Sequence, residues 1–224
     1  MKRFVSVLCL ALALAGLGPR AGLASWVGDN CSAYNYEDNH VKRADAQAYS
    51  TIAEEEGYEW GGGCWNDNDK DDTPGAPDSN GEGADCSGLT FKTWELEKTW
   101  GQAGFHHWSK QENIHGPYQA QGYHDASSSF HPFHRMKNWT DRSKTQYMDA
   151  FASDTHIGIL YTSSNPGANT DWIIEALGDS SGMDKNEEGY RFDSRYVGVR
   201  RESWTLDCWP NCAGQPDAHV VVIR

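Results

Sequence analysis

A cysteine stands where the sequence changes from a loop to a helix. Residues 83–88, GADCSG, end an acidic, glycine-rich run, and the residues that follow, CSGLTFKTWELEKTW, have the spacing of an amphipathic helix. The sequence therefore predicts a helix that begins at Cys86. Unpaired amide groups and the helix dipole at such an N-terminus stabilise a thiolate, which makes a cysteine nucleophilic near neutral pH. A buried, inert thiol and a cysteine bound in a disulfide are the two alternatives.

The first residues predict an export signal. A basic start precedes an apolar stretch from Phe4 to about Leu17, and small residues near Ala24 suit cleavage by signal peptidase. We therefore expect a signal peptide over residues 1–24 and a secreted protein. A membrane anchor is the alternative, but the apolar stretch is shorter than the roughly 20 residues that span a bilayer. No later segment is apolar enough, so we expect no stable membrane insertion.

Length and charge narrow the class of protein. The chain has 224 residues, which suits one domain with a sizeable core, so we predict a single domain over residues 25–224. Loss of the predicted signal removes Lys2, Arg3 and Arg20, which reduces the basic residues from 19 to 16 against 32 acidic ones. Phosphate binding needs the opposite sign of charge, so we expect no nucleic-acid partner.

The cysteines of an exported chain are expected to form disulfides. Five remain after the predicted signal is removed, namely Cys31, Cys64, Cys86, Cys208 and Cys212. An odd number leaves one thiol unpaired, and four paired cysteines allow three connectivities, among which the sequence does not choose. Our preferred pairs are Cys208 with Cys212, across the turn CWPNC, and Cys31 with Cys64. Cys86 is then the free thiol.

A nucleophilic thiol needs a base, and the chain has nine histidines. Most lie between Gly101 and Met148, a polar and aromatic stretch without clear periodicity. We interpret these as loop residues: His106, His107, His115, His124, His131 and His134. A transition-metal site on the sequence HPFH at 131–134 is a further interpretation, but its proline disfavours a helical pair. His156 differs, because it begins the strand-like run HIGILY.

A hairpin would bring a carboxylate to His156. A loop rich in Ser, Asn, Pro and Gly separates HIGILY from a second apolar run, DWIIEAL. If the two strands are antiparallel and Tyr161 faces Thr170, then His156 faces Glu175. A carboxylate beside an imidazole holds its tautomer and orientation and stabilises its charged form. The sequence thus predicts a site of Cys86, His156 and Glu175, provided that the register does not slip by one residue.

The C-terminal part predicts the rest of the sheet. Residues 178–189, GDSSGMDKNEEG, have the composition of a loop. Residues 190–204 and the terminal run AHVVVIR at 218–224 together predict two or more strands. The terminal run is apolar enough to be a central strand.

Three short motifs stand in order along the chain, YEWGG at 58–62, DCSG at 85–88 and HIGI at 156–159. In this order they resemble the motifs of NlpC-type cell-wall cysteine peptidases. The resemblance covers about residues 41–177, including a helix predicted over 41–57 and a strand at 148–152. It implies an α+β, papain-like fold, in which the nucleophile begins a helix packed on an antiparallel sheet that carries the base.

The resemblance also implies roles for single residues. Cys86 would be the nucleophile, His156 the base and Glu175 the third polar residue. The residues at positions that line the site and hold the substrate or the oxyanion are Tyr58, Asp85 and Ser87. Family members hydrolyse amide bonds in peptidoglycan stem peptides, often beside D-glutamate. No glycine loop of the cofactor-binding kind is present, so we expect no cofactor. We also expect no catalytic metal.

The chain departs from the family pattern by two insertions, at about 63–83 and 101–148. Long loops near sites are commonly functional, so the insertions predict a lid or a specificity wall, with a flexible excursion as the alternative. A glutamate in the third position is a further departure, because another polar residue is more usual there. We therefore expect a secreted cysteine hydrolase that acts on peptidoglycan peptides or muropeptides. A transglutaminase-like acyltransferase and a non-catalytic wall-binding module are the alternatives.

Alternating acids in the first insertion suggest a calcium loop. Asp67, Asp69 and Asp71 alternate, and Asp78 stands at the twelfth position. The glycine expected at the sixth position is Asp72. A solvated run of charges is the other interpretation of this segment.

Overall fold

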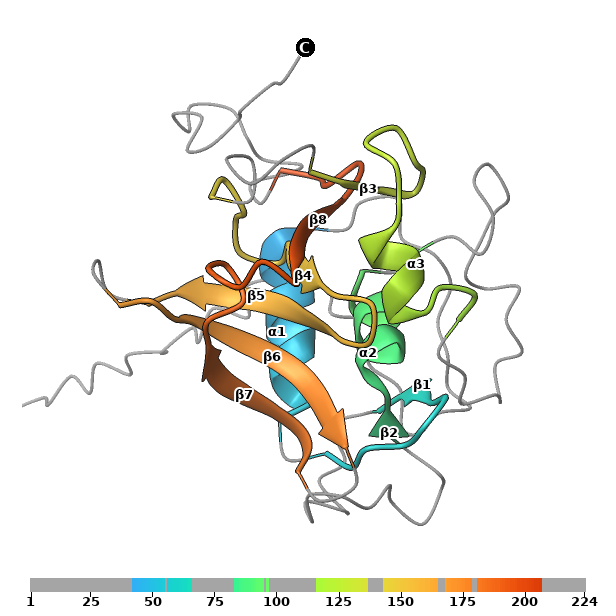
Figure 1. Ribbon diagram of the computed structural model, residues 1–224. Helices are drawn as coiled ribbons and strands as arrows, with labels where there is room; N and C mark the ends of the chain where they lie inside the picture. The colour runs from blue at the N-terminus through green and yellow to red at the C-terminus, as the bar shows by residue number, and fades with distance from the viewer. Residues whose placement is uncertain are drawn as a thin grey trace, which may run out of the picture.

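The computed structural model describes residues 42–54, 56–65, 83–94, 96, 116–136, 143–164, 168–178 and 181–206. The elements in these ranges are α1 (Arg43–Ile52), β1 (Gly63–Cys64), β2 (Gly83–Ala84), α2 (Cys86–Thr93), α3 (Ala120–His124), β3 (Phe133–Arg135), β4 (Ala150–Ala152), β5 (Ile157–Ser163), β6 (Asp171–Gly178), β7 (Gly182–Glu188) and β8 (Val197–Arg201) (Figure 1). Within these ranges, no helix has the length and apolar character needed to cross a membrane.

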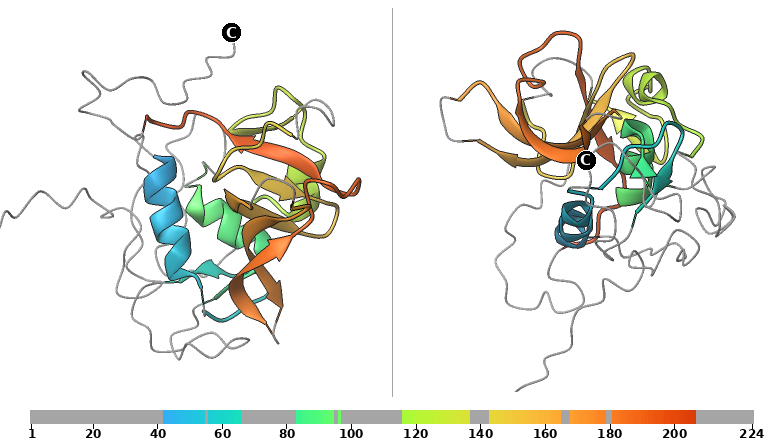
Figure 2. Two further views of the ribbon diagram at one scale, coloured as in Figure 1. Left: turned by 90° about the vertical axis from the view of Figure 1, so that its left-hand side faces the viewer. Right: turned by 90° about the horizontal axis from the view of Figure 1, so that it is seen from below.

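The main element is a six-stranded sheet in the order β3-β8-β4-β5-β6-β7. All of its neighbouring strands are antiparallel. Helices α1 and α2 lie on the same side of this sheet, with α2 between α1 and the strands (Figure 2). The predicted α+β class is therefore confirmed.

Helix α2 is shorter and more buried than its sequence pattern predicted. It begins at Cys86, as expected, but ends at Thr93, whereas the predicted pattern continued to Trp100. All residues from Ser87 to Thr93 are buried, and α2 contacts α1, β5 and β6. The prediction of an amphipathic helix is wrong, because a helix with protein on all sides needs no polar face.

Two residues allow this helix to be enclosed. A Cβ at Gly88 would lie 1.9 Å from the carbonyl oxygen of Gly62, so only glycine permits the approach of the two backbones. Lys92 is buried in the same layer, where its Nζ donates to the carbonyl oxygen of Trp65 at 3.1 Å. The ammonium also lies 4.9 Å from the centroid of the Trp65 ring, a distance that allows a cation–π interaction.

Strands β5 and β6 form the predicted hairpin, but in another register. The prediction placed Tyr161 opposite Thr170, whereas the structure pairs Ile159 with Ile174 and has a bulge directly after Leu160. At the pair Ile159–Ile174 the predicted register is therefore wrong by two residues. A bulge adds one residue to one strand only, and the alternation of apolar residues does not reveal where it lies.

Other predicted elements have mixed outcomes. The helix at 41–57 and the strand at 148–152 are confirmed as α1 and β4, with narrower bounds. The loop predicted at 178–189 is wrong, because β7 lies there and pairs with β6. An edge strand bonds to one neighbour only and can be largely polar, so its composition resembles that of a loop. The strand predicted at 218–224 lies outside the described residues.

The second predicted insertion contributes two elements. Helix α3 and strand β3 both lie within residues 101–148, and β3 extends the main sheet by pairing with β8. His124 ends α3 and His134 lies in β3, so the prediction that these two are loop residues is wrong. Strands β1 and β2 pair with each other and hold the two ends of the first insertion side by side.

Several predictions concern segments that the structure does not describe. The predicted signal peptide at 1–24 and the calcium loop at 67–78 lie outside the described residues. So do the predicted disulfide partners Cys31, Cys208 and Cys212.

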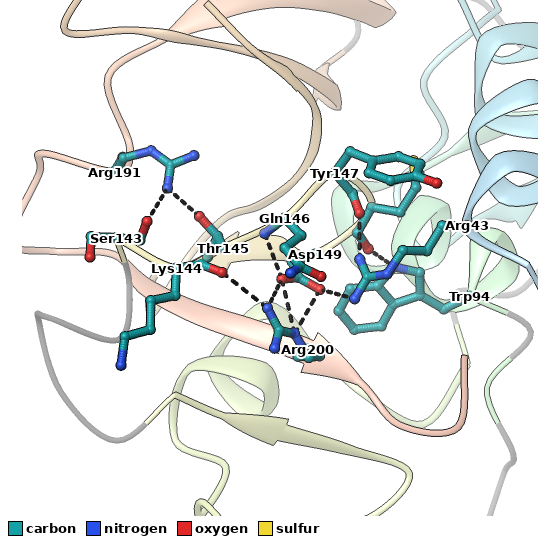
Figure 3. A network of polar contacts seen from close by, with 11 residues as sticks. Arg43, Trp94, Ser143, Lys144, Thr145, Gln146, Tyr147, Asp149, Arg191 and Arg200 are labelled. Carbon is teal, nitrogen blue, oxygen red and sulfur yellow. Dashed lines mark hydrogen bonds and ion pairs between the residues drawn. The ribbon is translucent and has the colours of Figure 1, made fainter. Parts of the chain in front are cut away.

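A buried carboxylate joins α1 to the sheet (Figure 3). Asp149, directly before β4, is fully buried. Its Oδ1 accepts a hydrogen bond from Nη2 of Arg43 at 2.9 Å, and its Oδ2 accepts one from Nη2 of Arg200 at 2.7 Å. The backbone N–H of Gln146 donates to Oδ2 at 2.8 Å. Two guanidinium groups, one from α1 and one from β8, therefore compensate the buried charge.

We expect Asp149→Ala to lower the free energy of unfolding by about 3–5 kcal/mol, because it leaves two partly buried guanidinium groups without their counter-charge. Urea denaturation followed by circular dichroism measures this change. Asp193→Ala is the matched control, since its partner Arg195 is mostly exposed and its loss should leave the unfolding curve almost unchanged. Equal unfolding curves for the two variants would contradict the role of Asp149 in joining α1 to the sheet.

Candidate active site

The first turn of α2 is held by Asp85, which caps the helix. Oδ1 of Asp85 accepts hydrogen bonds from the backbone N–H of Gly88 and from Oγ of Ser87, both at 2.7 Å. Oδ2 accepts from the backbone N–H of Gly61 at 3.0 Å. Asp85 and Ser87 are both buried. In this arrangement the two side chains bind each other and fix the backbone around Cys86.

Cys86 follows this cap as the first residue of α2. It is a free, half-buried thiol, as the sequence predicted. A residue at this position cannot bond its backbone N–H within the helix, so the N–H remains able to bind a ligand. The positive end of the helix dipole favours negative charge at the same place.

Tyr58 lies beside the strand that leads to Cys86. Its backbone forms a parallel bridge with Ala84, two residues before the cysteine. Its partly buried ring packs against the core cluster that contains Tyr49 and Ala84. The structure therefore brings Tyr58, Asp85 and Cys86 into one region, although they come from two separate segments of the chain.

His156 lies between β4 and β5, in a turn with a fixed backbone. The N–H of Ser153 donates to the carbonyl oxygen of His156 at 2.8 Å, and the N–H of His156 donates to Oγ of Ser153 at 3.1 Å. The side chain of His156 is mostly buried, with 18% of its surface exposed.

Glu175 of β6 contacts this imidazole. Nε2 of His156 lies 2.7 Å from Oε2 of Glu175, whose side chain is fully buried. The observed register puts Glu175 opposite Gly158, two residues along from His156. Side chains alternate between faces with a period of two, so an error of two residues keeps Glu175 on the predicted face. A Cβ at Gly158 would lie 3.3 Å from Oε2, so the glycine leaves room for the carboxylate to reach His156.

The surroundings of His156 favour its charged form. Burial lowers the pKa of His156, but hydrogen bonds to Cys86 and Glu175, with the negative charges of both groups, outweigh burial and raise this pKa from 6.5 to about 9. Because Glu175 occupies Nε2, Nδ1 is the ring nitrogen left for the thiol. A helix, a turn and a strand thus bring Cys86, His156 and Glu175 together.

Tyr190 is a member of this site that sequence reasoning missed. Its hydroxyl donates a hydrogen bond to Oε2 of Glu175 at 2.7 Å. It lies just after β7, in a segment without a motif or a clear apolar pattern. No signal in the sequence connects it with Glu175, because the contact depends on how the chain turns after the edge strand.

Tyr123 of α3 is a second residue that was missed. It is fully buried, and its hydroxyl has no hydrogen-bond partner within the described part of the chain. Burial raises its pKa well above the ordinary value, as do the charges of Tyr118, Asp85 and Cys86. Its ring belongs to the core cluster against which Cys86 packs.

One group of side chains beside α3 has the spacing of metal ligands. Nδ1 of His124 lies 2.7 Å from Oδ1 of Asp125 and 3.1 Å from Oδ1 of Asp154. Both carboxylates are exposed, and their contacts with Nδ1 of His124 account for the arrangement. The two histidines of the HPFH sequence at 131–134 each contact Glu202.

Comparisons with known proteins return no relatives. No family model, no curated protein and no solved structure matches the chain. Assignment of this site to a class of protein therefore depends on its geometry and on the resemblance of its motifs.

We expect His156 to titrate near pH 9 in the folded protein, measured by the NMR shift of its Cε1–H group. Glu175→Gln and Cys86→Ala should each lower the midpoint, because each removes a group that stabilises the imidazolium. His134→Asn, on the outer strand β3, is the control and should leave it unchanged. A midpoint near 6.5 in the wild-type protein would contradict the site as described.

This titration also predicts how stability depends on pH. The folded pKa of about 9 exceeds the unfolded value near 6.5, so protonated His156 stabilises the fold fully below about pH 6.5. The contribution is lost as the pH rises through about 9. The difference in unfolding free energy between wild type and His156→Ala, measured at pH 6 and at pH 10, should therefore be larger at the lower pH.

Proposed function

We propose that the protein is a secreted cysteine hydrolase of the papain-like kind, which cleaves an amide bond in peptidoglycan stem peptides or muropeptides. The observation that carries this proposal is the position of His156 between a helix-start thiol and a buried carboxylate. A free thiol with an adjacent base, and a third group that orients the base, is the arrangement that activates a cysteine nucleophile.

The reaction begins with the thiol and the imidazole. The raised pKa of His156 favours an imidazolium near neutral pH. A cation beside a cysteine favours the thiolate form, which is the nucleophile. Sγ of Cys86 attacks the carbonyl carbon of the amide and forms a C–S bond, while the carbonyl π electrons move to oxygen. The backbone N–H of Cys86 is suited to bind this oxyanion, because it has no acceptor within the helix.

Two proton transfers complete the cycle. As the tetrahedral adduct collapses, the C–N bond breaks, and His156 gives its proton to the leaving amine. The acyl group then remains on Cys86 as a thioester. Neutral His156 takes a proton from water, and the resulting hydroxide attacks the thioester carbonyl. The C–S bond breaks, the carboxylic acid product leaves, and thiolate and imidazolium are restored.

Glu175 keeps the imidazole in position during both transfers. Its carboxylate lies 2.7 Å from Nε2, so Nδ1 is the nitrogen that exchanges the proton with sulfur, amine and water. Its charge stabilises each imidazolium state. Tyr58, Asp85 and Ser87 complete the proposed site by shaping the backbone around Cys86 and the region where substrate binds.

The substrate class follows from the motifs. YEWGG, DCSG and HIGI occur in the order found in NlpC-type cell-wall peptidases. In the folded chain Tyr58 pairs with Ala84, next to the DCSG motif, and His156 of the HIGI motif bonds to Cys86. The export signal expected at the N-terminus supports a substrate outside the cell membrane.

We expect the mature protein to cleave defined muropeptides, with products identified by mass spectrometry. Cys86→Ala should abolish cleavage and His156→Ala should remove nearly all of it, because these groups form bonds or move protons. Glu175→Gln should retain part of the activity and Glu175→Ala less, since an orienting group assists without reacting. His134→Ala is the matched control and should keep full activity. Cleavage by Cys86→Ala would contradict the proposal, and capture of an added amine in the product would indicate acyl transfer.

We also expect iodoacetamide at neutral pH to label Cys86 rapidly, as measured by peptide mapping without reduction. His156→Ala should slow this labelling, because it removes the imidazolium that stabilises the thiolate. Rapid labelling with no cleavage of any muropeptide would overturn the substrate class alone. Equal labelling rates for wild type and His156→Ala would overturn the thiolate–imidazolium pair.

A further inference from the structure

One oxygen of Glu175 accepts two hydrogen bonds. Nε2 of His156 and the hydroxyl of Tyr190 both lie 2.7 Å from Oε2. The other oxygen, Oε1, is buried and has no hydrogen-bond partner within the described ranges. Both interactions of this carboxylate are therefore concentrated on the oxygen that faces the imidazole.

The ring of Tyr190 is held in place on several sides. It stacks on the Tyr196 ring with centroids 4.1 Å apart and an interplanar angle of 16°. It lies edge-on to His156 at 5.9 Å, and its Cε2 would be 3.3 Å from a Cβ at Gly158. These contacts fix the direction of its hydroxyl toward Glu175.

We propose that Tyr190 is a positioning residue of the active site, which takes part of the charge of Oε2 of Glu175 and so limits how tightly this carboxylate binds the His156 imidazolium. The inference rests on the proposed function, because the role assigned to Tyr190 is to set how firmly Glu175 binds the imidazolium. The Tyr190 hydroxyl bonds to the carboxylate of Glu175, and it acts on the imidazole through that carboxylate.

The reason is competition between two donors for one oxygen. A carboxylate oxygen that accepts from Tyr190 has less charge available for His156, so the imidazolium is bound less tightly. Without the hydroxyl, Oε2 no longer shares its negative charge with Tyr190 and interacts more strongly with Nε2 of His156. Imidazolium then becomes more stable and gives up its proton to the leaving amine less readily.

The Tyr190 hydroxyl stays protonated, and so remains a hydrogen-bond donor, over the pH range in which His156 titrates. Burial raises the pKa of Tyr190 far above its ordinary value, as do the charge and the hydrogen bond of Glu175 and the charges of Tyr196 and Glu188. The other charged or titratable groups that act on this region are Glu188 of β7, Tyr196 and Arg195, with Cys86 beyond His156. The Tyr190 hydroxyl also bonds to Tyr196, so its removal changes that contact but leaves Glu188, Arg195 and Cys86 in place.

The test is the NMR titration of His156 in Tyr190→Phe, which keeps the ring and removes the hydroxyl. We expect the midpoint to rise above about 9 by roughly half to one pH unit, and kcat at neutral pH to fall about 3- to 10-fold. Tyr161→Phe is the matched control. That hydroxyl lies on β5 and bonds to Thr51 at 3.1 Å, so its removal should leave the midpoint unchanged.

Two further variants test the same point. In a Glu175→Gln background, Tyr190→Phe should cause no further shift, because the charge through which Tyr190 acts is gone. Incorporation of 2,3-difluorotyrosine at position 190 strengthens the donor and should lower the midpoint, and it also serves if Tyr190→Phe does not fold. An unchanged or lowered midpoint in folded Tyr190→Phe would overturn the proposal, as would an equal shift in the Glu175→Gln background or no response to the fluorinated residue.

These titrations need no substrate, so they separate the two proposals. Failure to cleave muropeptides, together with the expected shifts, would overturn the proposed substrate and leave the role of Tyr190 intact. Cleavage with no shift in Tyr190→Phe would leave the proposed function intact and overturn the role of Tyr190.

Discussion

Close packing around α2 fixes the position of the site relative to the sheet. This helix has α1 on one side and β5 and β6 on the other, and its residues after Cys86 are buried. Gly88 permits the backbone of Gly62 to pass against the helix, and the cap on Asp85 fixes its first turn. A helix packed this closely has one position against the sheet. The thiol at its first residue is therefore brought to His156, which another segment of the chain supplies.

The two buried carboxylates Asp149 and Glu175 have different roles. One joins structural elements, and the other contacts an imidazole in the candidate active site. Asp149 accepts hydrogen bonds through both oxygens from guanidinium groups, whose charge does not change in the working pH range (Figure 3). Glu175 instead faces an imidazole, whose protonation changes during the proposed reaction, and its Oε1 has no partner among the described residues. The first arrangement is suited to holding elements together. The second is suited to stabilising a charge that appears and disappears.

The described part of the second inserted segment is integrated into the domain more closely than its composition suggests. Strand β3 extends the sheet at one edge, and α3 contributes Tyr123 to the core cluster beside Cys86. The sequence did not predict either element, because the segment is polar and aromatic without periodicity. Short elements of this kind get much of their stability from tertiary contacts, which local patterns do not show. The edge strand β7 was predicted as a loop for a related reason, because a strand with one bonded neighbour needs few apolar residues.

Sequence patterns were enough to predict the helix start at Cys86, the hairpin of β5 and β6, and the contact of His156 with Glu175. These features follow from local patterns, and the contact survives an error of two residues because strand side chains alternate with a period of two. The sequence did not predict the burial of α2, the bulge after Leu160 or the hydrogen bond from Tyr190 to Glu175. Each of these features depends on packing and hydrogen bonds between segments that are distant in the chain. The free energy of such contacts cannot be inferred from a local sequence pattern.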